Sequence, residues 1–121
     1  MIKKIFLRLI LFIILIPWGT SISQVFAEKD IELADIKYNR AILLMDSSPS
    51  LAMNELNTAK ELNPKDPKIV VAIGQIYFRQ NNYQEAIKAF EKAIKLNKNY
   101  VVAYSNLGYT YMSLREWDKA I

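Results

Sequence analysis

The chain has 121 residues, which is enough for one small domain, and it contains neither cysteine nor histidine. That composition excludes disulfide bonds, cysteine nucleophiles, serine–histidine pairs and zinc sites built from histidine or cysteine. The formal net charge is +4, but the charge is spread unevenly, because Lys3, Lys4 and Arg8 all lie at the N-terminus.

Residues 1–27 have the pattern of a secretory signal peptide. Basic residues precede an apolar run that continues unbroken from Leu9 to Ile16, and small side-chain positions follow at Val25 and Ala27. We therefore predict cleavage after Ala27 and an exported protein, located in the periplasm or cell envelope or secreted. The alternative is an uncleaved N-terminal anchor, although the apolar stretch 5–18 is shorter than the roughly 20 residues that a membrane-spanning helix needs.

Removing residues 1–27 lowers the net charge to +1, because that segment contributes three basic side chains and no acidic ones to the total of +4. No basic stripe with interleaved aromatic residues is present in the rest of the sequence. We therefore expect no nucleic-acid partner, and membrane contact only through the signal segment if it stays uncleaved. We also expect no metal, no cofactor and no catalytic residue, since the acids fall at helix caps or on polar helix faces and no glycine-rich phosphate loop occurs.

Two helices are predicted in the part of the chain before residue 66. Apolar residues at three-to-four spacing predict the first helix over residues 36–45 and the second over residues 49–62. Ser48 and Pro49 suit the N-cap and the first turn of the second helix, and Asn63 with Pro64 marks its end.

Residues 67–100 contain the clearest pair of predicted helices. The first, helix A, covers residues 67–80 and follows Asp66, which suits an N-cap. Two asparagines then interrupt the apolar pattern, and helix B runs onward from Tyr83. The residues from Asn82 to Glu85 have the spacing of a capping box.

The same unit recurs further along the chain. Three residues return 34 positions later, namely Gly74 as Gly108, Tyr77 as Tyr111 and Ala86 as Ala120. A fixed period of this length predicts stacked helical hairpins. Glycine inside a helix costs about 1 kcal/mol relative to alanine, so we predict that helices A and B approach closely at Gly74 and at Gly108, where a side chain would obstruct them.

This unit resembles a tetratricopeptide repeat. The pattern of that family has a large apolar residue, Leu-Gly, Tyr, Ala, Phe, Ala and Pro at set places, and here those places hold Val70, Ile73-Gly74, Tyr77, Ala86, Phe90, Ala93 and Lys98. The resemblance implies an all-α fold of helix-turn-helix repeats stacked as a right-handed α-solenoid. It divides the chain into a signal peptide (1–27), a divergent first repeat (28–66), a second repeat (67–100) and a truncated third repeat (101–121) with helix A and the start of helix B.

Two features of this division stay open at the level of sequence. The alternative for the first repeat is a capping helix that is not part of the array. The third repeat leaves Tyr104, Leu107 and Tyr111 uncovered. We therefore expect that the protein continues beyond Ile121 or that a partner covers this end. If the chain stops at Ile121, we expect the exposed apolar end to cause self-association.

In this family the A helices line a concave groove that binds a peptide or a helix. Mapping the groove positions onto this sequence gives Lys37, Ala41, Leu44, Lys68, Val71, Gln75, Phe78, Arg79, Val102, Ser105, Tyr109 and Met112. The resemblance therefore implies aromatic anchors at Phe78 and Tyr109, and cations that suit a partner with acidic or C-terminal carboxylate flanks. The alternative for both rings is packing between neighbouring A helices.

The sequence thus predicts a non-catalytic protein-interaction scaffold of the cell envelope. The export signal followed by repeats, together with the sequences at 106–109 and 117–120, resembles exported tetratricopeptide proteins of type IV pilus biogenesis. The alternative is the N-terminal recruitment arm of a longer exported enzyme whose catalytic part follows Ile121.

Overall fold

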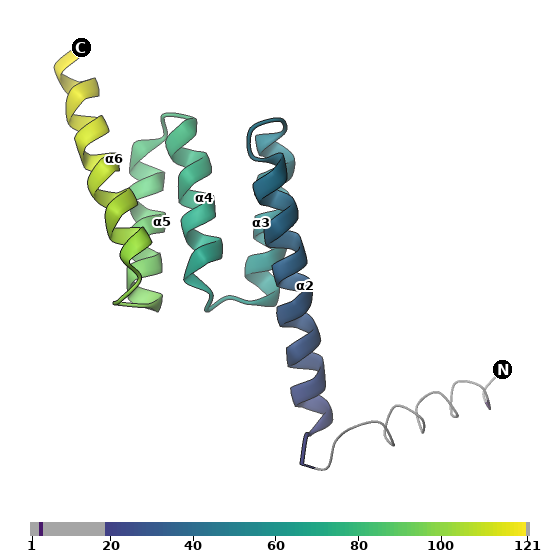
Figure 1. Cartoon of the computed structure of the whole chain (residues 1–121). Coiled ribbons are helices and arrows are strands. Elements are labelled where there is room, and N and C mark those ends of the chain that lie inside the picture. Colours follow the sequence, from purple (N-terminus) through teal and green to yellow (C-terminus); the bar gives the residue numbers. More distant parts are fainter. Residues whose placement is uncertain (1–2, 4–18, 121) are drawn as a thin grey trace.

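A computed structural model describes Lys3 and residues 19–120 of the chain (Figure 1). Residues 19–120 form five helices in succession and contain no strand: α2 (Ile22–Leu44), α3 (Pro49–Leu62), α4 (Pro67–Arg79), α5 (Tyr83–Leu96) and α6 (Val101–Ala120). The predicted all-α fold is confirmed for this part of the chain. Most of the residues that indicate a signal peptide, 1–2 and 4–18, lie outside the described residues.

Neighbouring helices in the sequence are also neighbours in space. Helix α2 packs along α3, α4 packs along α5, and α6 lies against α5 with a smaller contact to α4. A further contact between α3 and α4 joins the two hairpins, and Figure 1 shows the helices side by side in chain order. This is the predicted array of stacked hairpins, while the right-handed turn of a longer solenoid stays a prediction.

Helix α4 is the central element, because it contributes side chains to both hydrophobic clusters. It is buried without interruption from Ile69 to Gly74, and again at Ile76. A helix that is apolar around most of its circumference needs neighbours on several sides. The first cluster consists of Ala34, Ala41, Met45, Ala52, Leu56, Ala59, Ile69, Ala72, Ile73 and Ile76, and the second of Val70, Val71, Ala86, Phe90, Ala93 and Ala103.

The close approach predicted at Gly74 is confirmed. A methyl group at this position would lie 2.6 Å from Cε1 of Phe90 on α5, well inside van der Waals contact. Phe90 is only 1% exposed, so its ring has no free space to move into. The absent side chain of Gly74 therefore makes room for this ring in the hairpin.

The same prediction is wrong at Gly108. No atom lies within 4 Å of the place that a methyl group would occupy there, and the residue is exposed on α6. The physical reason is that no helix among residues 19–120 covers this side of α6 in the way that α5 covers α4. Gly108 lacks the contact that explains Gly74.

The beginnings of three helices show which caps form. Asp66 caps α4, because its Oδ1 accepts a hydrogen bond from the backbone N–H of Lys68 at 3.0 Å. Ser48 and Asn82 stand at the N-cap positions of α3 and α5, but neither side chain makes a capping hydrogen bond. The predicted capping box at Asn82 is therefore wrong. The turn before α5 is made instead by Asn81, which has a φ of 61°, a conformation that asparagine tolerates better than most residues.

Helix α6 runs without a break where the repeat pattern predicts a turn. Its 20 residues include Trp117, which stands 34 positions after Tyr83, so helix B of the third repeat is expected to start there. Arg115 stands at the position equivalent to Asn81, and arginine disfavours the left-handed conformation that ends α4. The predicted start of a second helix at Trp117 is therefore wrong, since this residue belongs to α6.

Helix α2 begins earlier than the predicted residue 36. The side chain of Ser21 accepts a hydrogen bond from the backbone of Gln24, whose side chain accepts from Ser21 in return, so a capping box starts the helix at Ile22. The first buried residue of α2 is Ala34, and Figure 1 shows the earlier turns extending beyond α3. The proposed cleavage point after Ala27 lies in this extension, and cleavage there stays a prediction. Within the described residues, no helix is both long and apolar enough to span a membrane.

The two helical glycines provide a matched test of the packing. Gly74→Leu places a side chain into the Phe90 ring, and we expect overpacking to lower the free energy of unfolding by about 1–3 kcal/mol. Gly108→Leu meets no neighbour and replaces a poor helix former, so we expect unchanged stability or a gain of about 1 kcal/mol. Urea unfolding followed by circular dichroism measures both. Equal destabilisation of the two variants would contradict the role of Gly74.

Candidate partner-binding surface

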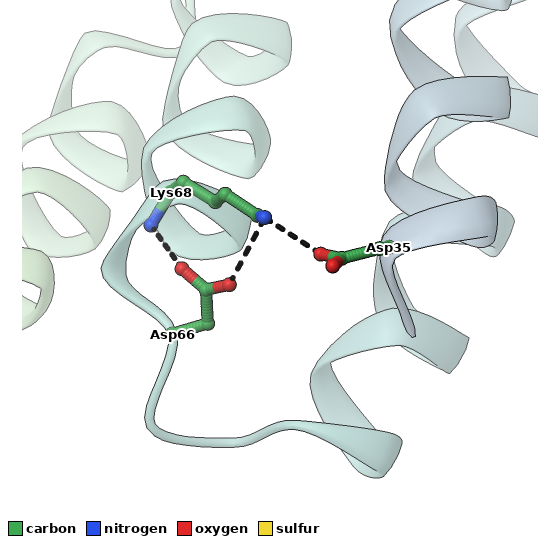
Figure 2. A network of polar contacts seen from close by, with 3 residues as sticks. All are labelled: Asp35, Asp66 and Lys68. Atoms are coloured by element: carbon green, nitrogen blue, oxygen red, sulfur yellow. Dashed lines mark hydrogen bonds and ion pairs between the residues drawn. The ribbon is translucent and has the colours of Figure 1, made fainter. Parts of the chain in front are cut away.

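Lys68, near the start of α4, bridges two acidic side chains (Figure 2). Its Nζ donates to Oδ1 of Asp35 on α2 at 2.6 Å and lies 3.5 Å from Oδ2 of Asp66. The same ammonium lies 5.2 Å from the centre of the Tyr38 ring, within the range of a cation–π interaction. This network joins the first hairpin to the N-terminus of α4.

The surroundings shift the pKa values of two side chains at this end of the array. The hydrogen bond to Asp35 raises the pKa of Lys68 above its ordinary value, and the charges of Asp66 and Asp35 act in the same direction against the opposing effect of burial. Burial raises the pKa of Tyr100. Both shifts favour a charged lysine and a neutral tyrosine in the folded protein.

Arg79, at the other end of α4, makes the second connection to the first hairpin. Its guanidinium pairs with Asp46, which follows the end of α2. Each of the two ion pairs, Asp35–Lys68 and Asp46–Arg79, joins residues 33 positions apart, so both link equivalent levels of successive A helices. The polar contact between α4 and α6 involves no charged group. Nε2 of Gln75 donates a hydrogen bond to Oδ1 of Asn106 at 3.5 Å.

Lys37 is oriented toward α3. Its Nζ lies 3.0 Å from Oε2 of Glu55, and Nη1 of Arg40 lies 3.5 Å from the other oxygen of the same carboxylate. Oε2 of Glu55 is buried and accepts no hydrogen bond of good geometry, so the Lys37 charge at 3.0 Å is what compensates its burial. Lys37 therefore acts within the first hairpin.

These contacts correct part of the predicted groove. Lys37, Lys68 and Arg79 are expected from the sequence to meet acidic flanks of a partner, but each is paired with an acid of its own chain. Val71 is expected on the groove floor but is 3% exposed, because it belongs to the second hydrophobic cluster. Ala41 is fully buried and belongs to the first. None of the three cations is free, and neither of the two apolar residues offers surface to a partner.

A second part of the predicted groove does come together, between α4 and α6. The ring centres of Phe78 and Tyr109 lie 5.3 Å apart, and the Phe78 ring also lies 5.4 Å from that of Tyr83. Such tilted pairs at this distance stabilise one another beyond simple burial. Beside them lies a recess of about 250 Å³, lined by Gln75, Phe78, Arg79, Asn106, Tyr109 and Thr110.

An adjoining recess continues this surface along α6. It has a volume of about 450 Å³ and is lined by Tyr83, Tyr109, Met112, Ser113, Glu116 and Trp117. We call Phe78, Tyr83, Tyr109, Met112 and Trp117 together the aromatic surface. Two of its members, Tyr83 and Trp117, are absent from the groove predicted from the sequence. Their signal is the repeat itself, since aromatic residues stand 34 positions apart at the same place in the unit.

The two predicted anchors have different surroundings. Phe78 is half-buried and packs against the second hydrophobic cluster, as in the alternative of packing between A helices. Tyr109 is 61% exposed and Met112 is 66% exposed, so both present most of their surface to solvent. Ser105 is exposed on the same helix, and Gln75 is half-buried in the wall of the recess. Phe78 is therefore held in place by packing, while Tyr109 beside it can contact a partner.

The chemistry of this surface is that of recognition. Its lining side chains are aromatic, amide, hydroxyl and thioether groups, with two charged residues, Glu116 and the paired Arg79. Among the described residues, no group of three or more histidine, cysteine, aspartate or glutamate side chains is close enough to hold a metal ion. The surface can bury apolar side chains and bond to peptide groups through its amides.

Known proteins share the repeat segment of this chain. The family model described as TPR repeat matches residues 74–114. Anaphase-promoting complex subunit CDC16 of Saccharomyces cerevisiae is 32% identical over 85 residues, and the DnaJ homolog subfamily C member 7 homolog of Schizosaccharomyces pombe is 40% identical over 52. The uncharacterized protein ycf37 of Pyropia yezoensis is 36% identical over 70 residues.

These similarities cover part of each protein. They include 59%, 41% and 54% of this chain for the CDC16 subunit, the DnaJ homolog and ycf37 respectively. The same alignments span only 10%, 11% and 39% of those relatives' own lengths. The chain therefore spans less than half the length of each of these relatives.

The Asp35–Lys68 contact predicts a pH dependence. A lysine whose pKa is raised by folding stabilises the fold below its unfolded pKa of about 10.4, and the stabilisation is lost as the pH rises through the raised folded value. We expect Asp35→Asn to lower the melting temperature at pH 8, by the equivalent of about 1 kcal/mol or less because the pair is partly exposed. The difference from wild type should shrink above about pH 10.4.

Thermal melts of both proteins from pH 8 to pH 11 measure this effect. The matched control is Glu85→Gln, which removes the acid from the exposed pair Glu85–Lys88 within α5. We expect that variant to leave the melting temperature almost unchanged. A difference for Asp35→Asn that stays constant over the whole pH range would contradict a contribution from the Lys68 charge.

Proposed function

Since the chain belongs to the tetratricopeptide repeat family, we propose that it is a non-catalytic scaffold that binds a partner peptide or helix on its aromatic surface. Proteins with such repeats bind protein partners through them, and the two recesses of this surface are both lined by aromatic side chains, Phe78 and Tyr109 in the first and Tyr83, Tyr109 and Trp117 in the second. The A helices α4 and α6 hold four of the five residues of the aromatic surface, and Tyr83 comes from the start of α5, which packs against both helices.

The observation that carries this proposal is the exposure of Tyr109 beside a packed ring. Phe78 fixes the position of the Tyr109 ring from one side, at 5.3 Å between centres, and 61% of Tyr109 remains exposed. A rigid aromatic side chain with free surface loses little entropy when it binds. Met112, one turn further along α6, adds an adaptable apolar contact.

The partner that fits this surface has apolar anchors. The two recesses are bounded by aromatic rings, and the amides of Gln75 and Asn106 can bond to peptide groups of a bound segment. Acidic flanks would have to displace Asp46 from Arg79 or Asp35 from Lys68. We therefore propose a segment with one or two large apolar side chains, for which charge is a secondary determinant.

We further propose that the scaffold acts in the cell envelope. The support is the pattern of residues 1–27, together with the fact that α2 buries no residue before Ala34, so cleavage after Ala27 leaves both hydrophobic clusters complete. The N-terminal residue of the protein recovered from its source cells tests this proposal. Glu28 is expected, and an intact Met1 would contradict it.

Assembly of type IV pili is the specific process that we propose, on the resemblance of residues 106–109 and 117–120 to middle repeats of exported pilus-biogenesis proteins. Deletion that left pilus assembly and secretin multimerisation intact would contradict it. A recruitment arm of a longer exported enzyme is the second candidate. It is favoured by the short span of the relatives that align, at most 39% of their lengths, and a catalytic segment following Ile121 would establish it.

Replacement of Tyr109 tests the aromatic surface. Peptides selected from a random library for binding to the full chain are labelled, and their dissociation constants are measured by fluorescence anisotropy. Tyr109→Ala removes the exposed anchor, so we expect binding to weaken about tenfold or more. The matched control is Tyr111→Ala, because Tyr111 is 48% exposed on a different side of the same helix, and we expect this variant to bind like wild type.

The result also decides between the two alternatives for the rings. Tyr109→Ala is expected to leave the melting temperature near that of wild type, whereas Phe78→Ala should lower it, because Phe78 packs against the second cluster. Peptides that bind Tyr109→Ala as tightly as wild type, and lose affinity for Tyr111→Ala, would overturn the proposal.

A further inference from the structure

A small recess lies between α3 and α5, the second helices of the two hairpins. Both helices pack on α4 and have at most a marginal contact with each other. The recess has a volume of about 180 Å³, and we call it the B-helix cleft. Val70 and Ile73 of α4, only 3% and 7% exposed, form its apolar floor together with Ala89 of α5. All residues that line the cleft belong to α3, α4 and α5, so it is an internal feature of the array.

The rim of the B-helix cleft is positively charged. It consists of Lys60 on α3, Lys88 and Lys92 on α5, and one acid, Glu85. Nζ of Lys88 donates a hydrogen bond to Oε1 of Glu85 at 2.8 Å, so these two charges compensate each other. Among the described residues, the ammonium groups of Lys60 and Lys92 have no hydrogen-bond or ion-pair partner. Two uncompensated positive charges from different helices therefore border one recess.

The cations on the A helices differ from these two. Lys37, Lys68 and Arg79 are each paired with an acid of the chain. An incoming carboxylate competes with no such acid at Lys60 or Lys92, and the apolar floor beside them strengthens its attraction to both charges. The B-helix cleft is therefore a better place for an acidic segment than the predicted groove.

The size and lining of the cleft restrict what can fill it. Pockets for small molecules have volumes of about 300–1,000 Å³, so a recess of about 180 Å³ has room for a side chain rather than for a whole ligand. None of the residues that line it is aromatic, so it offers no ring on which a nucleic-acid base could stack. An aliphatic side chain flanked by carboxylates fits both the floor and the rim.

The chain carries such a segment on the early turns of α2, which extend beyond α3 (Figure 1). Glu28, Ile31 and Glu32 have the spacing i, i+3 and i+4, so they share one face of the helix. All three are exposed, Ile31 by 47%, and neither carboxylate is paired with another described residue. Cleavage after Ala27 would keep all three, and acids in the first turn of the remaining helix would favour its N-terminus.

We propose that the B-helix cleft of one copy binds this α2 segment of a second copy, with Ile31 on the floor and both glutamates paired with Lys60 and Lys92. The two surfaces of one molecule cannot meet, because α2 continues as a single helix into the exposed turns, away from α5 (Figure 1). The contact is therefore between molecules, and its paired charges fix the register of the bound segment.

This inference goes beyond the proposed function, because it concerns other faces of the array. The aromatic surface is formed by α4, α6 and the start of α5, whereas the contact between copies uses the B-helix cleft and the early turns of α2. The two surfaces share no residue, so each can be removed separately.

Sedimentation velocity of the full chain, with charges exchanged between the two surfaces, tests the contact. We expect wild type to self-associate with a dissociation constant of about 10–100 μM, and about tenfold more weakly when the salt concentration rises from about 0.05 M to about 0.5 M. Lys60→Glu with Lys92→Glu should give monomers, as should Glu28→Lys with Glu32→Lys. An equimolar mixture of the two double variants should associate again, because each acidic surface then meets a basic one.

Two further variants separate this contact from general effects of charge and folding. Lys95→Glu with Lys98→Glu makes the same charge change at exposed residues outside the cleft, and should associate like wild type. Ile31→Ala removes the apolar anchor at an exposed position, and should weaken association about tenfold without lowering the melting temperature. Circular dichroism checks that every variant is folded.

Four outcomes would overturn the inference: a wild type that is monomeric up to about 1 mM, association that neither double variant weakens, an equal loss in the Lys95 and Lys98 control, or a mixture that stays monomeric. Tyr109→Ala should associate like wild type, and both double variants should bind the library-selected peptides with wild-type affinity. Failure of the contact between copies is therefore distinguishable from failure of the aromatic surface.

Discussion

The fold depends on the contact between the Phe90 ring and the bare backbone at Gly74. It lets α5 lie close to α4, and this closeness completes the burial of a helix that is apolar on nearly all sides. Helix α4 is buried by neighbours on two sides. Ile69 and Ile76 are buried against the first hairpin, α2 and α3, while Val70 is buried against α5. The array is therefore a set of interfaces rather than one core, as expected of stacked repeats.

The two interfaces between successive A helices have different chemistry, and this difference places the candidate site. Asp35–Lys68 and Asp46–Arg79 join α2 to α4, and they use the cations that a groove of this kind can offer to acidic partners. The interface between α4 and α6 holds tilted aromatic rings and an amide pair. An apolar partner segment thus finds its best contact at the second interface, where exposed aromatic surface is concentrated.

Helix α6 gives the array two exposed surfaces with separate chemistry. Tyr109 and Met112 belong to the aromatic surface, which is rich in exposed side-chain area. Gly108 lies on another exposed side of α6, where no atom is within 4 Å of the place that a methyl group would occupy. The aromatic surface suits large apolar side chains of a partner.

The period of 34 residues, the helix A and helix B pattern and the burial of Ala86 and Phe90 follow from the sequence, because apolar spacing and residue size are local properties of each unit. The groove positions that the family resemblance implies include Phe78 and Tyr109, whose ring centres lie 5.3 Å apart in the structure. Tertiary structure decided the rest, because each of these features depends on which neighbour is present. Asp35 pairs with the charged Lys68, and α5 makes Gly74 a packing contact, while no helix among residues 19–120 covers Gly108.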